Sequence, residues 1–139
     1  RSIDAYVLGE HGDTSFPVWS SSSVIGKSIF DFPGFTQKTA DECYEKTRTA
    51  AYRIIHDVGY TCYSIATVCR QIARAIAEDT HEVFMLSTLL ENYYSQKDVC
   101  LSVPCVLGRK GIADVLKIPL NEEEQKKFAK SAKVVKAYL

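Results

Sequence analysis

The sequence lacks an excess of charge of either sign, because 17 lysines and arginines balance 17 aspartates and glutamates among its 139 residues. A formal net charge of zero removes any general attraction to nucleic acid or to an anionic membrane, so we expect neither as a partner. The chain also lacks an apolar run near the roughly 18 residues that a membrane-spanning helix needs. We therefore expect a soluble domain.

The five cysteines are odd in number and form no C-x-x-C pair. They lie inside apolar stretches, which favours free thiols in a reducing compartment over a disulfide framework. These observations predict a cytoplasmic location.

Nucleotide-binding and metal-binding motifs are absent as well. The chain has no G-x-G-x-x-G fingerprint and no P-loop, and its nearest approaches at 9–12 and 108–111 lack the third glycine. The usual binding motif of a dinucleotide cofactor is therefore not in these residues. A metal site at Glu10, His11 and Asp13 is disfavoured, because neighbours on one turn seldom converge on one ion and no H-x-x-x-H pair accompanies them.

The pattern of apolar residues and turn formers predicts an α+β fold: mixed or antiparallel strands, two consecutive helices and a C-terminal helix. Strands are expected at 3–8, 83–90, 99–107 and 112–118, with an extended stretch at 16–19. Because the first strand begins almost at once and without an initiator methionine, we expect a further segment upstream.

One helix is expected over 38–58, ending at Gly59, and a second helix is expected directly after it. The second helix carries an apolar stripe that is ordinarily core: Ile65, Val68, Ile72 and Ile76. Asn121 and Glu124 predict a capping box at the start of the last helix. The expected buried stripe of that helix is Phe128, Ala132 and Val135.

His11 is the strongest candidate for chemistry. It lies just past the end of the first strand, between Gly9 and Gly12, with carboxylates at Glu10 and Asp13. Imidazole gives and takes a proton near neutral pH, and flanking glycines let a substrate approach the backbone closely. From spacing alone an ordinary turn histidine is the more frequent case, so both interpretations stay open at this point.

Thr61 is a second candidate, at the junction of the two central helices. A helix start presents free N–H groups, and with a small hydroxyl these suit a carboxylate ligand. The alternative, that Thr61 only caps the second helix, is the one that the sequence by itself favours. The remaining histidines, His56 and His81, are expected to be structural or solvated.

The heptapeptide Leu8-Gly9-Glu10-His11-Gly12-Asp13-Thr14 resembles the active-site signature of the lactate and malate dehydrogenase family. Four further segments resemble the same family in the same order: FPVWS at 16–20, AAYRII at 50–55, GYT at 59–61 and VLGRKGI at 106–112. The resemblance extends from Ile3 to the last residue. It favours the lactate branch, notably through the PVW segment and Thr61.

The resemblance implies that residues 1–139 are the C-terminal catalytic and substrate domain, and that an N-terminal Rossmann domain binding NAD lies outside this chain. It implies an oxidoreductase of glycolysis and fermentation, a homotetramer that interconverts pyruvate and L-lactate. His11 then donates a proton to the keto oxygen as hydride arrives from NADH, and takes the hydroxyl proton in reverse. Thr61 matches a pocket threonine that admits a methyl-bearing substrate, and Ile65 an apolar residue packed against the nicotinamide.

Some of the family's machinery cannot be assigned in this chain. In the family, a D-x-x-R segment supplies an aspartate that orients the histidine and an arginine that binds the substrate carboxylate, and Arg1 does not fit that pattern. Bacterial members activated by fructose 1,6-bisphosphate carry a histidine where this chain has Asp4. Because a carboxylate repels phosphate groups, we expect that activation to be weak or absent.

Two alternatives remain beside the lactate dehydrogenase interpretation. The domain can serve a malate or other 2-hydroxy acid dehydrogenase, since most of the residues that select the substrate lie outside this chain. It can also be an inactive fragment that only oligomerises. The 139 residues alone are expected to be inactive in every case.

Overall fold

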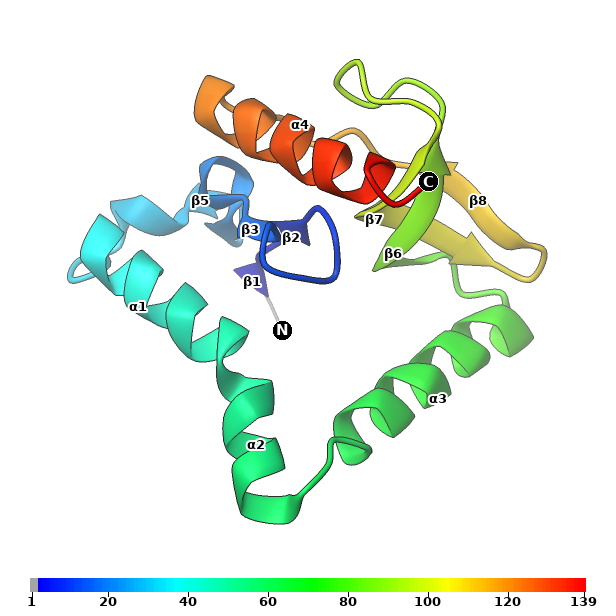
Figure 1. Cartoon of the computed structure of the whole chain (residues 1–139), viewed down its shortest axis with the longest axis horizontal. Coiled ribbons are helices and arrows are strands. Elements are labelled where there is room, and N and C mark those ends of the chain that lie inside the picture. The colour runs from blue at the N-terminus through cyan, green and yellow to red at the C-terminus, as the bar shows by residue number, and fades with distance from the viewer. Residues whose placement is uncertain (1–2) are drawn as a thin grey trace.

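The structure, a computed structural model, describes residues 3–139 and has the expected α+β fold. Figure 1 shows the long antiparallel sheet with the short strands beside it, the last helix across them and the other helices in an arch on the opposite side. The elements are β1 Ile3–Asp4, β2 Val7–Leu8, β3 Phe16–Pro17, η1 Trp19–Ser21, β4 Ser23–Val24, β5 Lys27–Ser28, η2 Ile29–Asp31, α1 Gln37–Arg48, α2 Ala50–Val58, α3 Tyr63–Glu78, β6 Glu82–Leu90, β7 Val99–Gly108, β8 Gly111–Val115 and α4 Glu122–Lys136.

The largest sheet is an antiparallel meander in the order β6-β7-β8. Strand β6 pairs with β7 over its whole length, from Glu82 opposite Leu107 to Leu90 opposite Val99. The turn into β8 uses Gly111 at φ +100°, a conformation that glycine adopts readily. The hairpin expected from the sequence is therefore confirmed. Strand β7 is central and supplies alternate side chains to the core: Val99, Leu101, Val103, Cys105 and Leu107.

Strand β8 ends at Val115, so its expected extension to residue 118 is wrong. Beyond that point the Leu116 N–H still donates to the Pro104 carbonyl of β7 at 2.8 Å, and the backbone groups that follow are held by two tyrosine hydroxyls. The Tyr93 hydroxyl donates to the Leu116 carbonyl at 3.1 Å and accepts from the Ile118 N–H at 3.3 Å. The Tyr94 hydroxyl donates to the Ile118 carbonyl at 2.9 Å. Because side chains satisfy these backbone groups, the strand ladder does not have to continue.

The strand expected at 3–8 is divided into β1 and β2 because its two ends take different partners. Strand β1 pairs with β4, whereas β2 forms an antiparallel hairpin with β3 that places Leu8 opposite Phe16. The stretch expected to be extended at 16–19 is β3, followed at Trp19 by a 3-10 turn. The β2–β3 hairpin is the part of the fold that presents the loop 9–14.

Helix α4 begins with the expected capping box. The Asn121 side chain accepts from the Glu124 N–H at 2.9 Å, and the Glu124 carboxylate accepts from the Asn121 N–H at 2.9 Å. Of the expected stripe, Phe128 and Ala132 are fully buried and Val135 is half-buried.

The core lies between α4, strand β7 and the β2–β3 hairpin. The Phe128 ring lies 6.5 Å from that of Phe16, edge to face, and 5.4 Å from that of Tyr93. Leu8 and Leu101 are fully buried in the same cluster. The residues directly before the loop 9–14 are thus anchored in the core.

The helix expected over 38–58 is two helices, α1 and α2, joined at Thr49. The Thr49 hydroxyl donates to the Glu45 carbonyl at 2.7 Å. Such a bond to the preceding turn competes with the regular helical pattern and bends the helix. Gly59 ends α2 at φ +90°, in the expected cap position.

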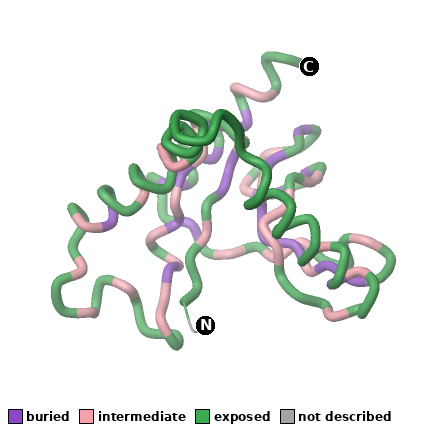
Figure 2. The backbone as a smooth tube through the Cα atoms, turned by 90° about the horizontal axis from the view of Figure 1, so that it is seen from below, coloured by how far each residue is buried: buried purple, intermediate pink, exposed green. Residues whose placement is uncertain are grey.

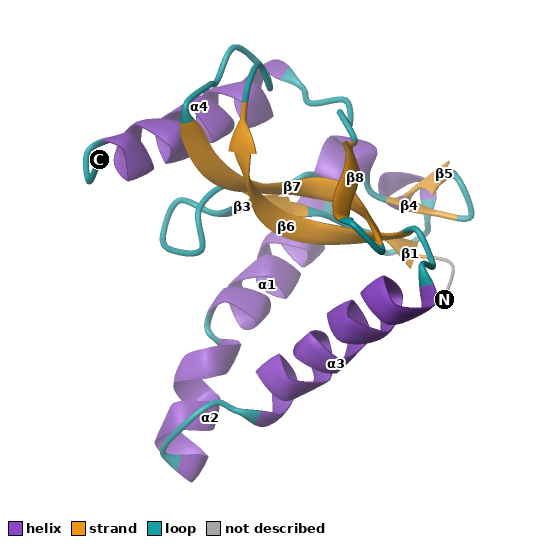
Figure 3. Ribbon diagram, turned by 90° about the vertical axis from the view of Figure 1, so that its right-hand side faces the viewer, coloured by secondary structure: helices purple, strands orange, loops and turns teal. Residues whose placement is uncertain are grey.

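The apolar stripe of α3 is not core in this chain, which corrects the expectation from its periodicity. Ile65 and Val68 are 59% and 43% exposed, while Ile72 and Ile76 are half-buried. Figure 2 shows α2 and α3 as mostly exposed, and Figures 1 and 3 show their junction projecting away from the sheets. An apolar face of this kind is typical of an interaction surface.

All five cysteines are free thiols, as expected. Cys105 is buried in the sheet, and burial raises the pKa of its thiol. Within residues 3–139, none of the helices has the length and apolar character needed to cross a membrane.

Burial raises the pKa of Tyr93 to about 12, from an ordinary value of 10.0. The native state therefore holds the phenol proton more tightly than the unfolded state, which adds stability below pH 10 that is lost as the pH rises toward 12. Two pKa units correspond to about 2.7 kcal/mol. In urea unfolding of the 139-residue chain, the stability advantage of the native protein over Tyr93→Phe is expected to shrink by about that amount across this range.

The exposed Tyr138 provides the control for this prediction, since its side chain is 87% accessible. Tyr138→Phe is expected to keep the alkaline loss of stability of the unmodified chain. A parallel loss in Tyr93→Phe would contradict the assignment of that effect to Tyr93.

Candidate active site

His11 lies in the loop that joins β2 to β3, and the root of this loop is tied to the central strand β7. Gly9 has φ +103°, and its N–H and carbonyl exchange hydrogen bonds with Ser102 at 3.3 and 2.8 Å. The glycine is required here, because a Cβ at this position would lie 2.7 Å from the Ser131 hydroxyl oxygen. The loop therefore starts from a fixed backbone.

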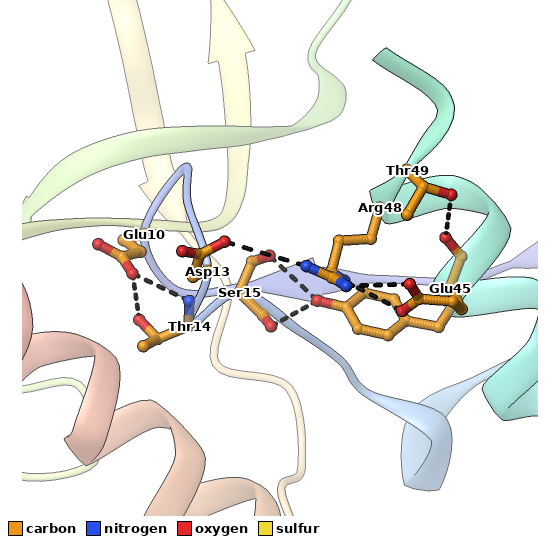
Figure 4. A network of polar contacts seen from close by, with 8 residues as sticks. Glu10, Asp13, Thr14, Ser15, Glu45, Arg48 and Thr49 are labelled. Atoms are coloured by element: carbon orange, nitrogen blue, oxygen red, sulfur yellow. Dashed lines mark hydrogen bonds and ion pairs between the residues drawn. The ribbon is translucent and has the colours of Figure 1, made fainter. Parts of the chain in front are cut away.

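The inner side of the loop contacts helix α4. The Glu10 N–H donates to the Ser131 hydroxyl oxygen at 2.7 Å, although these residues are 121 positions apart in sequence. The Glu10 carboxylate accepts from the Thr14 N–H at 2.9 Å and from the Thr14 hydroxyl. Figure 4 shows this carboxylate turned to Thr14, across the loop. Glu10 thus closes the turn that carries His11.

The outer side of the loop contacts helix α1 (Figure 4). The Tyr44 hydroxyl donates to the Ser15 carbonyl at 2.5 Å. Arg48 lies 4.0 Å from the Asp13 carboxylate and donates to Glu45 at 2.9 and 3.1 Å. That hydrogen bond lowers the pKa of Glu45 and raises the pKa of Arg48. Helices α1 and α4 thus hold the loop from two sides.

The His11 side chain itself is exposed and faces open space. It lines a depression of about 340 Å³ together with residues of α1 and α2, among them Tyr44, Arg48 and Tyr52. It also lines a second depression of about 360 Å³ against the sheet, beside Met85 and Ser87. The imidazole is therefore accessible to a small molecule from a rigidly held backbone.

Thr61 and Ile65 lie where α2 and α3 meet: Thr61 is between the two helices and Ile65 is in the first turn of α3. Thr61 is exposed in the connection between the helices. The idea that it caps α3 is wrong, because the N-cap is Cys62 and makes no side-chain cap bond. Neither Thr61 nor Ile65 lines the depressions beside His11. Within this chain the structure does not bring them together with the histidine.

No sequence pattern indicated Ser131, Ser102, Tyr44 or Arg48 as supports of the loop. Ser131 and Ser102 are ordinary small residues in a helix and a strand, and no local pattern marks a contact over such a sequence distance. Arg48 and Tyr44 follow no motif either. As for metals, no group of three or more His, Cys, Asp or Glu side chains within residues 3–139 is placed to hold an ion.

Fold and site together define an α+β domain that presents an accessible histidine on a loop held by two helices. The model of the lactate/malate dehydrogenase α/β C-terminal domain matches residues 1–139. The chain belongs to the lactate/malate dehydrogenase family and is its C-terminal α/β domain. The resemblance seen in the sequence is thereby confirmed.

Individual relatives include lactate and malate dehydrogenases. The chain is 42% identical over 139 residues to L-lactate dehydrogenase 1 of Staphylococcus aureus strain JH9, covering 98% of this chain and 44% of that protein. Among solved structures, MGS-M5, a lactate dehydrogenase enzyme from a Medee basin deep-sea metagenome library, superposes with a TM-score of 0.93 at 32% identity, over 99% of this chain and 45% of that one.

The malate dehydrogenase from Aeropyrum pernix superposes with a TM-score of 0.88 at 31% identity, over 98% of this chain and 45% of that one. The chain thus spans less than half the length of the relatives it matches.

Proposed function

We propose that this chain is the substrate domain of an NAD-dependent L-lactate dehydrogenase that interconverts pyruvate and L-lactate, with His11 as the proton donor and acceptor. The observation that carries the proposal is the 42% identity to an L-lactate dehydrogenase over 98% of this chain. In the structure of this chain, the motif histidine His11 is exposed on a loop held by two helices. The proposed setting is cytoplasmic glycolysis and fermentation.

The chemistry assigned to His11 follows from where charge develops. Addition of hydride to the keto carbon builds negative charge on the carbonyl oxygen, and a positioned imidazolium stabilises that charge and then supplies the proton. In the reverse direction the neutral imidazole takes the hydroxyl proton of lactate. The exposed ring and the depressions on either side of it support this role.

NADH supplies the hydride when it is bound, and the residues present fit only its nicotinamide end. Ile65 offers an exposed apolar side chain on the first turn of α3, which suits packing against a flat ring. Thr61, also exposed and small, is proposed to border the methyl group of the substrate. Because Thr61 does not line the depressions beside His11, this contact requires α2 and α3 to approach the loop in the full-length protein. The glycine fingerprint for the cofactor phosphates does not occur in residues 1–139.

A second domain is therefore part of the proposal. We propose an N-terminal Rossmann domain that binds NAD, and assembly of the whole protein into a homo-oligomer, specifically a homotetramer. The apolar side chains left uncovered on α2, α3 and their connection support a large contact with such a domain or with another copy. They include Ile55, Val58, Tyr60, Tyr63, Ile65 and Val68, which are 43–78% exposed.

The test uses the full-length protein that carries this chain. It is expected to oxidise NADH with pyruvate, and the coding sequence before Arg1 is expected to supply G-x-G-x-x-G and D-x-x-R segments. The isolated 139 residues, run on size-exclusion chromatography and assayed in parallel, are expected to be inactive. A full-length protein that oligomerises but turns over no 2-keto acid would support the inert assembly module instead.

Malate dehydrogenase activity is the second candidate, favoured by the likeness to the Aeropyrum pernix malate dehydrogenase at a TM-score of 0.88. The two activities are separated by kcat/KM for pyruvate and for oxaloacetate in the same preparation. A higher value for oxaloacetate, or for a bulkier 2-keto acid, would replace lactate by that substrate in the proposal.

Fructose 1,6-bisphosphate is expected to have little or no effect on the full-length protein. Asp4 is exposed in β1, and its carboxylate accepts from the Ser23 hydroxyl at 3.4 Å, so a phosphate at this position meets a negative charge. The measurement is KM for pyruvate with and without the bisphosphate. A large fall in KM would contradict the prediction.

A further inference from the structure

Ser131, on the C-terminal helix α4, contacts the loop of His11 at two successive residues. It is fully buried, and its hydroxyl oxygen accepts from the Glu10 N–H at 2.7 Å. The same oxygen lies 2.7 Å from the place where a Cβ of residue 9 would be, so only a glycine fits against it. One side chain of α4 therefore fixes the backbone immediately before the histidine.

These contacts form a closed ring of hydrogen bonds whose direction follows from the protons available. The Thr14 hydroxyl has one proton and donates it in a hydrogen bond to the Glu10 carboxylate, because a carboxylate can only accept. The Thr14 and Ser131 hydroxyl oxygens are 3.1 Å apart, so the proton between them comes from Ser131. The ring runs from the Glu10 N–H through Ser131 and Thr14 to the Glu10 carboxylate.

A ring of this kind holds more firmly than its separate bonds. Each hydroxyl donates and accepts at once, and hydrogen bonds aligned in a chain polarise one another. Both ends of the ring belong to Glu10, the residue directly before His11. The backbone and the carboxylate of Glu10 are therefore fixed together, and with them the direction in which the His11 side chain leaves the loop.

We propose that Ser131 is a positioning residue that orients His11 through Glu10, which rests on the proposed function of His11 as the proton donor. Ser131 contacts the loop backbone and Thr14, and it acts on the reaction only by setting where the imidazole stands. Helix α4 and the β2–β3 hairpin are packed together in the core through Phe128 and Phe16. The ring of hydrogen bonds therefore fixes the position of the loop relative to that core.

The kinetic test is Ser131→Ala in the full-length protein. A displacement of the proton donor by about 1 Å costs up to about 100-fold in rate, so we expect kcat to fall about 10- to 100-fold. The KM for the keto acid is expected to change little, because the ring does not include the groups proposed to bind the substrate.

Ser22→Ala is the matched control. Ser22 is also buried, at 2% exposure, and its hydroxyl donates to the Val18 carbonyl at 2.8 Å, but it lies outside the loop. The Ser22→Ala variant loses a buried hydroxyl, as Ser131→Ala does, and is expected to keep the native kcat. An equal fall of kcat in both variants, or no fall in Ser131→Ala, would overturn the proposal.

Thr14 tests the same ring from its other side, including the case in which Ser131→Ala fails to fold. Thr14→Val keeps the shape of the side chain and removes the hydroxyl, so we expect the loss seen in Ser131→Ala. Thr14→Ser restores the hydroxyl and is expected to recover most of the activity. Equal activities of Thr14→Val and Thr14→Ser would contradict the ring.

A readout that does not depend on catalysis separates this inference from the proposed function. Hydrogen exchange of the Glu10 amide, followed by mass spectrometry on a peptide spanning the loop, is expected to be slow in the native protein and faster in Ser131→Ala. An unchanged rate overturns the ring whatever the activity. A native protein without dehydrogenase activity overturns the proposed function, and with it the role of Ser131 in the reaction, while the exchange rates still decide the ring.

Discussion

Replacing His11 by glutamine in the full-length protein is expected to lower kcat for pyruvate reduction by about 10²- to 10⁴-fold, the usual contribution of a positioned acid–base group. Glutamine can still donate a hydrogen bond to the carbonyl oxygen but cannot deliver a proton to it as hydride arrives. The measurement is NADH oxidation at saturating pyruvate. Binding of NADH, followed by fluorescence titration, is expected to persist because His11 lies outside the proposed dinucleotide domain.

The control for this variant is His81→Gln. His81 is exposed between α3 and β6, where its ring contacts the Asp79 carbonyl at 3.1 Å, and it has no part in the proposed site. It is expected to keep the native kcat. Unchanged turnover in His11→Gln would remove the central claim of the proposed function.

Gly9→Ala is expected to destabilise the 139-residue chain by about 3 kcal/mol or more in urea unfolding. A non-glycine residue at φ +103° costs about 1–3 kcal/mol in backbone strain. The added Cβ also meets the Ser131 oxygen at 2.7 Å, and overpacking of a buried contact costs about another 1–3 kcal/mol. Fluorescence of Trp19, the single tryptophan in the sequence, reports the transition.

Gly26→Ala separates the two contributions. Gly26 also has a positive φ, +75°, but nothing lies within 4 Å of the Cβ it would gain. The free energy of unfolding of Gly26→Ala is therefore expected to fall only by the strain of a left-handed backbone, about 1–2 kcal/mol. A Ser131→Ala background removes the 2.7 Å contact at residue 9 but keeps those with the Ser131 Cβ at 3.2 Å and the Thr14 carbonyl at 3.3 Å, so the penalty of Gly9→Ala is expected to shrink in part. Equal stabilities of Gly9→Ala and Gly26→Ala would show that the contact with Ser131 carries no weight.

Local sequence patterns predicted much of the architecture because the forces behind them are local. The capping box of Asn121 and Glu124, the Gly59 helix end and the hairpin at Gly111 each depend on residues a few positions apart. Their geometry is the same wherever the segment occurs in a fold. The loop signature around His11 is equally local, which is why its neighbouring residues are enough to single it out.

Patterns failed where an outcome depends on distant partners. The periodicity of α3 identified its apolar face, but burial of Ile65 and Val68 requires a partner that residues 3–139 do not provide. Strand β8 stops at Val115 because Tyr93 and Tyr94 take over the backbone groups that follow. The break of the first strand likewise depends on the separate pairings of β1 and β2.

The sequence by itself determined the fold class, the order of the longer elements, the family and the residue most suited to proton transfer, because each of these is encoded in short runs of neighbouring residues. Only the tertiary structure decided how that residue is held. Ser131 lies 121 positions from Glu10, and a hydrogen bond between them exists only because α4 packs its Phe128 against the hairpin that carries the loop. Such a contact depends on which distant residues meet in space, and the local patterns of a single sequence do not contain that information.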